Sequence, residues 1–93
     1  MKQIFGWFGA PLVAALICVS TPSQAQDMCY ELWLERNQIY KDAGYCFRTT
    51  RAIRTFGNAG CSYDDVRDVP LTPRDRQRIN QIVRMEQSYG CSR

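Results

Sequence analysis

CYELWLERNQIYKDAGYC, residues 29–46, is the stretch of sequence that decides the fold. Apolar side chains recur in it at spacings of three and four, which is the pattern of a helix with one buried face. We expect this helix over about residues 27–43, with Asp27 as its N-cap and Gly44 in a left-handed conformation at its end. The buried stripe is expected to consist of Cys29, Leu32, Trp33, Arg36, Ile39, Tyr40 and Ala43.

A shorter helix is predicted over about residues 50–56, capped by Thr49 or Thr50. The residues that follow, Gly57-Asn58-Ala59-Gly60, are of the types that form turns, and they should end this helix. The side chains expected to face inward are Ala52, Ile53 and Phe56.

A third helix has the clearest start signal in the chain. Thr72 is a good N-cap, Pro73 suits the first helical position, and Asp75 follows in the first turn. Gly90 is expected to end the helix. The inward stripe is expected to consist of Ile79, Ile82, Val83, Glu86 and Tyr89.

Residues 62–70 hold three aspartates and end at a proline, so we expect an irregular surface loop there. Tyr63 and Val66 are the loop side chains expected to reach the core. No stretch alternates between apolar and polar residues for long enough to predict a strand. The predicted fold is therefore all-α, a small three-helix domain.

The first 25 residues have the pattern of a cleaved secretory leader. Met1-Lys2 is positively charged, residues 4–19 carry no charge, and small residues precede a predicted cut after Ala25. A membrane anchor would need about 20 apolar residues, whereas this run has about 16 and Pro11 interrupts it. We expect one exported domain, residues 26–93, that is periplasmic or secreted and has no stable membrane insertion after cleavage.

Five cysteines occur in the chain, and Cys18 should leave with the leader, since the residue before it is too large for lipoprotein processing. The other four, Cys29, Cys46, Cys61 and Cys91, indicate two disulfides in a small exported domain. A helix of about 25 Å separates Cys29 from Cys46, which excludes that pair. Two pairings remain, 29–91 with 46–61 and 29–61 with 46–91. Antiparallel packing of the first and third helices favours the former.

Charge and composition exclude several classes of function. The chain has 12 basic and 9 acidic residues, and loss of Lys2 leaves a net charge of +2, too small an excess for a typical nucleic-acid-binding domain. There is no histidine to form a Ser-His or Cys-His pair. Cysteine spacings of 17, 15 and 30 residues do not suit a zinc site. We expect no catalytic activity, no cofactor and no metal site.

Arg48, Arg51 and Arg54 are spaced by three on the second helix and its approach, and they predict a basic ridge. Arginine presents a planar fork of donors that suits carboxylates and phosphates. The ridge is the candidate binding surface. The alternative is a solvated face that the aspartates of residues 62–70 balance.

Two polar residues of the first helix lie on its apolar stripe or directly beside it. Arg36 is expected to cover apolar surface with its stem or to meet an acid. Asn37 is expected to be a buried amide that bonds loop backbone around residues 57–60, because buried polar groups need partners. A ligand contact is the functional alternative for Asn37.

Residues 32–47 resemble the YARHG domain, a small bacterial domain of the extracellular space, through Leu32-Trp33, Arg36-Asn37-Gln38-Ile39-Tyr40 and Gly44-Tyr45-Cys46-Phe47. Asn80-Gln81-Ile82 before Glu86 is similar to the family's closing helix, so the resemblance spans about residues 29–91. Of the five signature residues only the first and the last match, and Ala43 replaces the histidine. The family-motif residues are Arg36, Asn37, Tyr40 and Gly44. The resemblance implies an exported domain with no catalytic activity attached to it.

Two functions are compatible with these observations. The first is a module that binds peptidoglycan or another anionic component of the cell envelope through the arginine ridge. The alternative is a structural or inhibitory partner of another exported protein. The two proteins would then recognise each other through exposed apolar surface.

Overall fold

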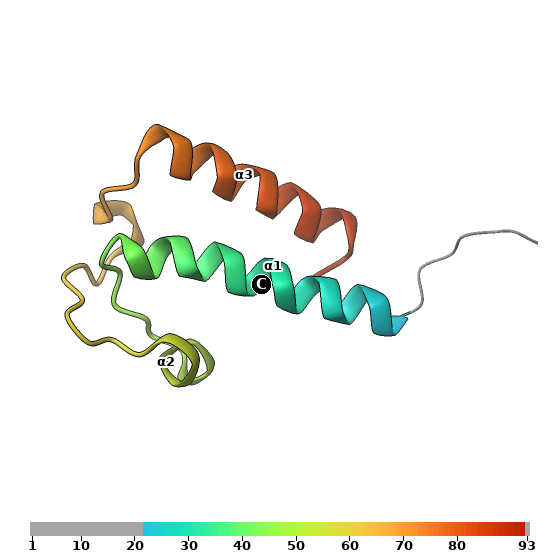
Figure 1. Ribbon diagram of the computed structural model, residues 1–93, viewed down its shortest axis with the longest axis horizontal. Helices are drawn as coiled ribbons and strands as arrows, with labels where there is room; N and C mark the ends of the chain where they lie inside the picture. Colours follow the sequence, from blue (N-terminus) through green and yellow to red (C-terminus); the bar gives the residue numbers. More distant parts are fainter. Residues whose placement is uncertain (1–21, 93) are drawn as a thin grey trace, which may run out of the picture.

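The computed structural model describes residues 22–92 as three α-helices joined by loops (Figure 1). The helices are α1 (Pro22–Asp42), α2 (Thr50–Phe56) and α3 (Pro73–Ser88), and a short 3₁₀ turn, η2, spans Val66–Asp68. α1 and α3 run antiparallel side by side, and α2 contacts α1 from the other side (Figure 1). The expected all-α class is confirmed. Residues 1–21 of the predicted leader, Cys18 included, fall outside the described residues, whereas the predicted cut after Ala25 lies within α1 and stays a prediction.

α1 begins earlier than the sequence pattern indicated. The helix starts at Pro22, so Asp27 lies within it and the prediction of Asp27 as N-cap is wrong. Proline suits the first turn of a helix because its φ angle is already helical and its missing N–H would have no partner there. Residues 23–26 contain no helix-breaking residue, and the helix therefore extends back to the proline.

Glycine ends each of the three helices, as expected. At the end of α1 the N–H of Gly44 donates to the carbonyl of Lys41 and that of Tyr45 to the carbonyl of Tyr40, with Gly44 at a φ of +96°. This is the Schellman arrangement, and the aromatic rings of Tyr40 and Tyr45 pack together beside it. At the end of α3 the N–H of Cys91 donates to the carbonyl of Glu86 in the same way.

The predicted N-caps of the other two helices are confirmed. The side chain of Thr49 accepts a hydrogen bond from the N–H of Ala52 at the start of α2. The side chain of Thr72 accepts one from the N–H of Asp75 at the start of α3, where Pro73 is the first helical residue. Each cap satisfies a backbone donor that the helix itself leaves unpaired.

The two disulfides have the favoured pairing. Cys29 bonds Cys91 with a Cα–Cα distance of 5.5 Å, and Cys46 bonds Cys61 with a Cα–Cα distance of 5.1 Å. The first joins the N-terminal half of α1 to the chain that leaves α3. The second joins the segment before α2 to the loop after it, where the N–H of Cys46 also donates to the carbonyl of Tyr63.

The core is small and lies along the α1–α3 interface and beneath α2. Its buried apolar residues are Leu32, Phe47, Ala52, Val69, Ile79 and Ile82. The expectation that Val66 reaches the core is wrong, because its side chain is 46% exposed and Val69 is buried instead. The η2 turn reverses the chain between these two valines and presents the later one inward. Ile53 and Tyr89 were also expected to face inward, and both are exposed. α2 packs against α1 alone among the described helices, on the side of Ala52, and Tyr89 is already the C-cap of α3.

Candidate functional site

A hollow of about 360 Å³ lies between α1, the start of α2 and the C-terminal end of the chain. Among the residues that the structure describes, three arginines and no acidic side chain line it. Its lining consists of Trp33, Arg36, Asn37, Tyr45, Phe47, Arg48, Thr49, Arg51, Ala52 and Ser92. Two family-motif residues and two of the three ridge arginines therefore meet at one place.

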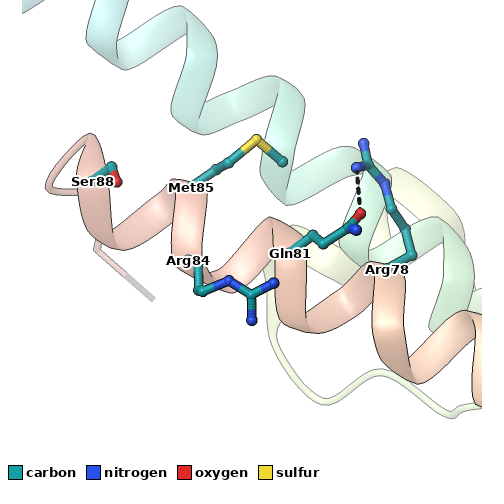
Figure 2. A pocket seen from close by; sticks show the side chains of 5 residues that line it. All are labelled: Arg78, Gln81, Arg84, Met85 and Ser88. Carbon is teal, nitrogen blue, oxygen red and sulfur yellow. Dashed lines mark hydrogen bonds between the residues drawn. The ribbon is translucent and has the colours of Figure 1, made fainter.

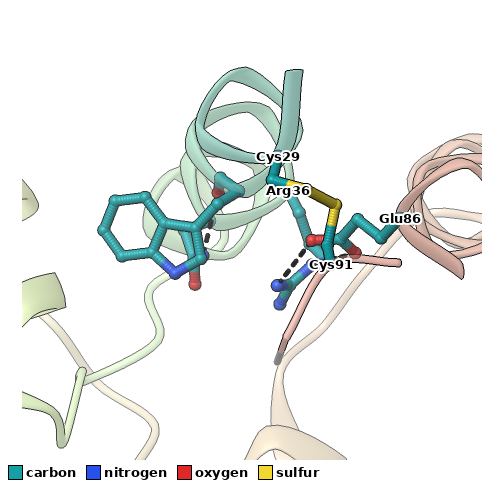
Figure 3. A network of polar contacts seen from close by, with 6 residues as sticks. Cys29, Arg36, Glu86 and Cys91 are labelled. Carbon is teal, nitrogen blue, oxygen red and sulfur yellow. Dashed lines mark hydrogen bonds and ion pairs between the residues drawn. A yellow bond between two sulfur atoms is a disulfide. The ribbon is translucent and has the colours of Figure 1, made fainter. Parts of the chain in front are cut away.

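Arg36 lines the hollow, and Glu86 of α3 holds its guanidinium. Nε donates to Oε1 at 2.9 Å and Nη2 donates to Oε2 at 3.0 Å, which makes a bidentate ion pair beside the Cys29–Cys91 disulfide (Figure 3). The Glu86 side chain is 1% exposed and that of Arg36 is 16% exposed. The expectation that Arg36 meets an acid is confirmed. Because the two charges offset each other, the excess positive charge of the hollow comes from its other arginines.

Asn37 is buried, as expected, but its predicted backbone partner is wrong. Its Nδ2 donates to the carbonyl of Trp33, one turn earlier in α1, at 2.9 Å. The turn at residues 57–60 is held by Asn58 instead, whose Oδ1 accepts from the N–H of Phe47 at 2.7 Å and whose Nδ2 donates to the Phe47 carbonyl at 3.0 Å. The backbone of that turn accepts a hydrogen bond from Lys41 and not from Asn37, with Nζ donating to the carbonyl of Gly57 at 3.2 Å.

Arg51 stacks on an aromatic surface that α1 provides. Its guanidinium carbon lies 3.9 Å from the ring centroid of Trp33 and 5.6 Å from that of Tyr30. A guanidinium that stacks by its face keeps its N–H donors in the plane of the group, where a ligand can reach them. Within residues 22–92 no hydrogen bond uses those donors, so the stacking orients Arg51 without consuming its donors.

Arg48 and Arg54, the other ridge arginines, differ in position. Arg48 lines the hollow with Arg51, whereas Arg54 lies one turn further along α2 and outside the lining. The pKa of Asp65 lies below its ordinary value, chiefly because the side chain and backbone of Arg67 donate hydrogen bonds to it, and the charge of Arg48 contributes less. The loop acid is therefore occupied by Arg67 and only partly balances the ridge.

Aromatic side chains form the wall of the hollow. Phe47 stacks with Phe56 at 5.2 Å between centroids and meets Tyr45 edge-on at 5.3 Å, and Trp33 packs against Phe56 at 5.6 Å. Trp33 and Phe56 were expected to face inward, and Phe47 is buried. Trp33, Tyr45 and Phe47 line the hollow and provide apolar surface beside the arginines.

Helix ends and disulfides hold the walls in place. Ser92 reaches the hollow because the preceding Cys91 is bonded to Cys29 of α1. Tyr45 reaches it because the Schellman end of α1 at Gly44 turns the chain back across the helix. The family-motif residues thus divide into two groups: Tyr40 and Gly44 shape the helix end, while the other two motif residues face the hollow.

A second hollow of about 360 Å³ lies along α3 and is lined by Arg78, Gln81, Arg84, Met85 and Ser88 (Figure 2). Arg78 is already occupied there. Its Nε and Nη2 donate to Glu35 of α1 at 2.6 and 2.8 Å, and its Nη1 donates to Gln81 at 3.2 Å. Because one helix supplies the whole lining, this surface is open on its other sides and is a weaker candidate.

The described part of the chain contains no cluster of three or more His, Cys, Asp or Glu side chains that would hold a metal ion. None of the helices in residues 22–92 is long and apolar enough to cross a membrane.

Sequence reasoning missed the contacts that join the ridge to α1. The stacking of Arg51 on Trp33 joins residues 18 positions apart, and no spacing rule connects them. Ser92 and Thr49 carry no motif that would mark them as lining residues. The one usable signal was that polar Asn37 adjoins an otherwise apolar helical stripe, because a buried amide there must serve either the fold or a ligand.

Comparison with known proteins identifies a family. The family model of the YARHG domain matches residues 13–87, most of the chain. No curated protein and no solved structure matches it. The YARHG domain is small, of uncertain function and often extracellular, and no catalytic activity is attached to it. The resemblance that the sequence indicated is confirmed.

Proposed function

This chain belongs to the YARHG domain family, and on that premise we propose that it is an exported binding module that holds an anionic group of the cell envelope in the hollow between α1 and α2. The two disulfides and the family support a place outside the cytoplasm, since disulfides persist in oxidising compartments. The anion we propose is a carboxylate of peptidoglycan.

One observation carries this proposal. Arg48 and Arg51 line the same hollow, no acid of residues 22–92 lines it with them, and the stacking on Trp33 orients the Arg51 guanidinium. An arginine fork binds a carboxylate through two parallel hydrogen bonds, which gives both energy and orientation. Because the Trp33 ring already orients the Arg51 side chain, that side chain loses less conformational entropy when a ligand binds.

Retention of the protein on purified peptidoglycan sacculi tests the proposal. We expect the double variant Arg48→Ser/Arg51→Ser to lose at least about tenfold in apparent affinity, because each charge-assisted hydrogen bond contributes about 1.5–3 kcal/mol. Arg54→Ser, compared with the single variant Arg51→Ser, is the matched control: each removes one positive charge from α2, but Arg54 lies outside the hollow. Circular dichroism of each variant checks that the helices remain.

The outcomes are distinct. Equal retention of the double variant and the wild type would overturn the proposal. An equal loss in Arg54→Ser would place binding on the ridge as a whole and not in the hollow. Retention should also fall between 50 and 500 mM NaCl, because exposed charges are screened.

A protein partner is the second candidate function. Met28 and Tyr89 are exposed large apolar side chains, and both line a hollow of about 410 Å³ near the ends of α1 and α3. Under this function the domain would be a structural or inhibitory partner of another exported protein. Co-purification of a stoichiometric protein that survives 500 mM NaCl would favour it over peptidoglycan, since apolar contacts are not screened by salt.

A further inference from the structure

The amide oxygen of Asn37 has no donor among the described residues. The Asn37 residue is only 8% exposed, and its Nδ2 is used by the carbonyl of Trp33 at 2.9 Å. Because a carbonyl accepts and never donates, this bond fixes which end of the amide is the NH₂ and leaves Oδ1 as the open acceptor. Buried acceptors are almost always paired, and Asn37 lines the hollow with Arg48 and Arg51.

We propose that the hollow is specific for an N-acylated amino-acid carboxylate, the group that ends a peptide chain, with its N–H donated to Asn37 and its carboxylate bound by Arg48 and Arg51. The inference rests on the function proposed above and names the ligand class for that same site. Peptidoglycan peptides and the C-termini of exported proteins both carry this group.

Three properties of the site favour this class over a simple anion. A lone carboxylate, like a phosphate diester, has no donor for the buried Asn37 oxygen at neutral pH. A free amino acid has donors, but its ammonium would approach the positive charges of Arg48 and Arg51. An acylated nitrogen is a neutral donor directly beside the carboxylate, and it meets both requirements.

The size and the wall of the hollow fit one terminal residue. A volume of about 360 Å³ is at the small end of the range for ligand sites, which begins near 300 Å³. Tyr45 and Phe47 offer apolar surface for a short aliphatic side chain. Thr49 Oγ1 accepts the cap bond from Ala52, so its hydroxyl hydrogen is available to the carboxylate.

Titrations of the wild-type protein with four small probes, followed by NMR chemical shifts, test the inference. N-acetylalanine carries both groups, and we expect it to bind most tightly. Butyrate and N-acetyl-N-methylalanine keep the carboxylate without the N–H and should bind about tenfold or more weakly, since they leave a buried acceptor unpaired. N-acetylalanine amide keeps the N–H without the carboxylate and should not bind measurably.

The results distinguish a failure of this inference from a failure of the proposed function on which it rests. If butyrate and N-acetyl-N-methylalanine both bind as tightly as N-acetylalanine, the ligand class is wrong while carboxylate binding stands. If no carboxylate binds, or the amide binds equally well, the proposed function fails and the inference fails with it.

A variant and a competition add independent readings. Leucine is close in size to asparagine and lacks the acceptor. The Asn37→Leu variant should therefore bind N-acetylalanine no more tightly than it binds butyrate. The wild-type comparison stands even where this variant fails to fold. N-acetylalanine should also elute the protein from sacculi. A peptide with a free C-terminus that binds more tightly than sacculi would make a protein C-terminus the natural source of the group.

Discussion

Arg36 of α1 and Glu86 of α3 form a bidentate ion pair that is almost wholly shielded from solvent. Glu86 is used twice, because its carbonyl also accepts the N–H of Cys91 at the end of α3. One residue thus ties α3 to α1 and also shapes the turn that leads to the Cys29–Cys91 disulfide (Figure 3). Because Arg36 also lines the hollow, the pair fixes the position of its guanidinium there.

Breaking this pair from one side should destabilise the domain strongly. We expect Arg36→Met to lower the free energy of unfolding by about 3–5 kcal/mol, because it leaves the buried Glu86 carboxylate without a partner. Glu86→Leu should cost less, since Arg36 retains some contact with solvent. The double variant Arg36→Met/Glu86→Leu should recover most of the loss. Urea unfolding at pH 7 measures all three, and a double variant as unstable as the sum of the single variants would contradict the expectation.

Gly44 should tolerate alanine worse than Gly60 does. Both glycines have positive φ angles, +96° and +72°, which cost an L-residue about 1–2 kcal/mol. A Cβ at Gly44 would also lie 3.3 Å from ring atoms of Tyr63, whereas one at Gly60 would meet nothing within 4 Å. Thermal unfolding of Gly44→Ala and Gly60→Ala separates backbone strain from the ring contact. Equal melting temperatures would show that Tyr63 moves aside without cost.

Glu35 should contribute stability that depends on pH. The hydrogen bonds from Arg78 hold the pKa of Glu35 below its ordinary value, so the folded state favours the ionised carboxylate. The contribution is present above the unfolded pKa, near 4.5, and is lost as pH falls through the lower folded value. Wild type and Glu35→Gln should therefore differ in unfolding free energy at pH 7 and converge at low pH.

The size of that difference at pH 7 should be small, because both side chains of the pair are partly exposed and salt screens them. Asp65→Asn is the control for an ion pair that does not join two helices. Asp65 also has a lowered pKa, but its partner Arg67 lies only two residues away in the same loop. A Glu35→Gln difference that grows as pH falls would reverse the expected sign.

The two disulfides should differ in how much they stabilise. The Cys29–Cys91 bridge closes a sequence separation of 62 residues and the Cys46–Cys61 bridge one of 15. In the chain-entropy model the first contributes about 4 kcal/mol and the second about 3 kcal/mol. Paired Cys→Ala variants of each bridge, unfolded in urea, should rank in that order. The opposite order would show that native-state contacts outweigh loop entropy here.

Local patterns in the sequence predicted most of the fold. The caps at Thr49 and Thr72 and the stop at Gly44 depend on residues a few positions apart, so a linear pattern contains them. Helix length excluded one disulfide pairing, and antiparallel packing favoured the observed one of the two that remained. The misplaced start of α1 has a local cause too, because Pro22 and Asp27 are both acceptable helix starts and spacing alone does not choose between them.

Long-range contacts were beyond such patterns. Val66 and Val69 look alike in the sequence, and only the direction of the η2 turn decides which one is buried. The candidate site is of the same kind, since Arg51 lies 18 residues from the ring on which it stacks and Ser92 arrives from the far end of the chain.

The sequence by itself therefore determined the three helices, the residues that end them and the two disulfide pairings among which the fold chose. These features follow from backbone hydrogen bonds, glycine conformation and chain length, which act locally or through simple geometry. Only the tertiary structure decided which of the arginines share a hollow, that Glu86 neutralises Arg36, and that the Asn37 oxygen finds no donor within residues 22–92. Those relationships depend on how the helices pack, because burial and charge pairing are properties of surfaces that meet only after the chain has folded.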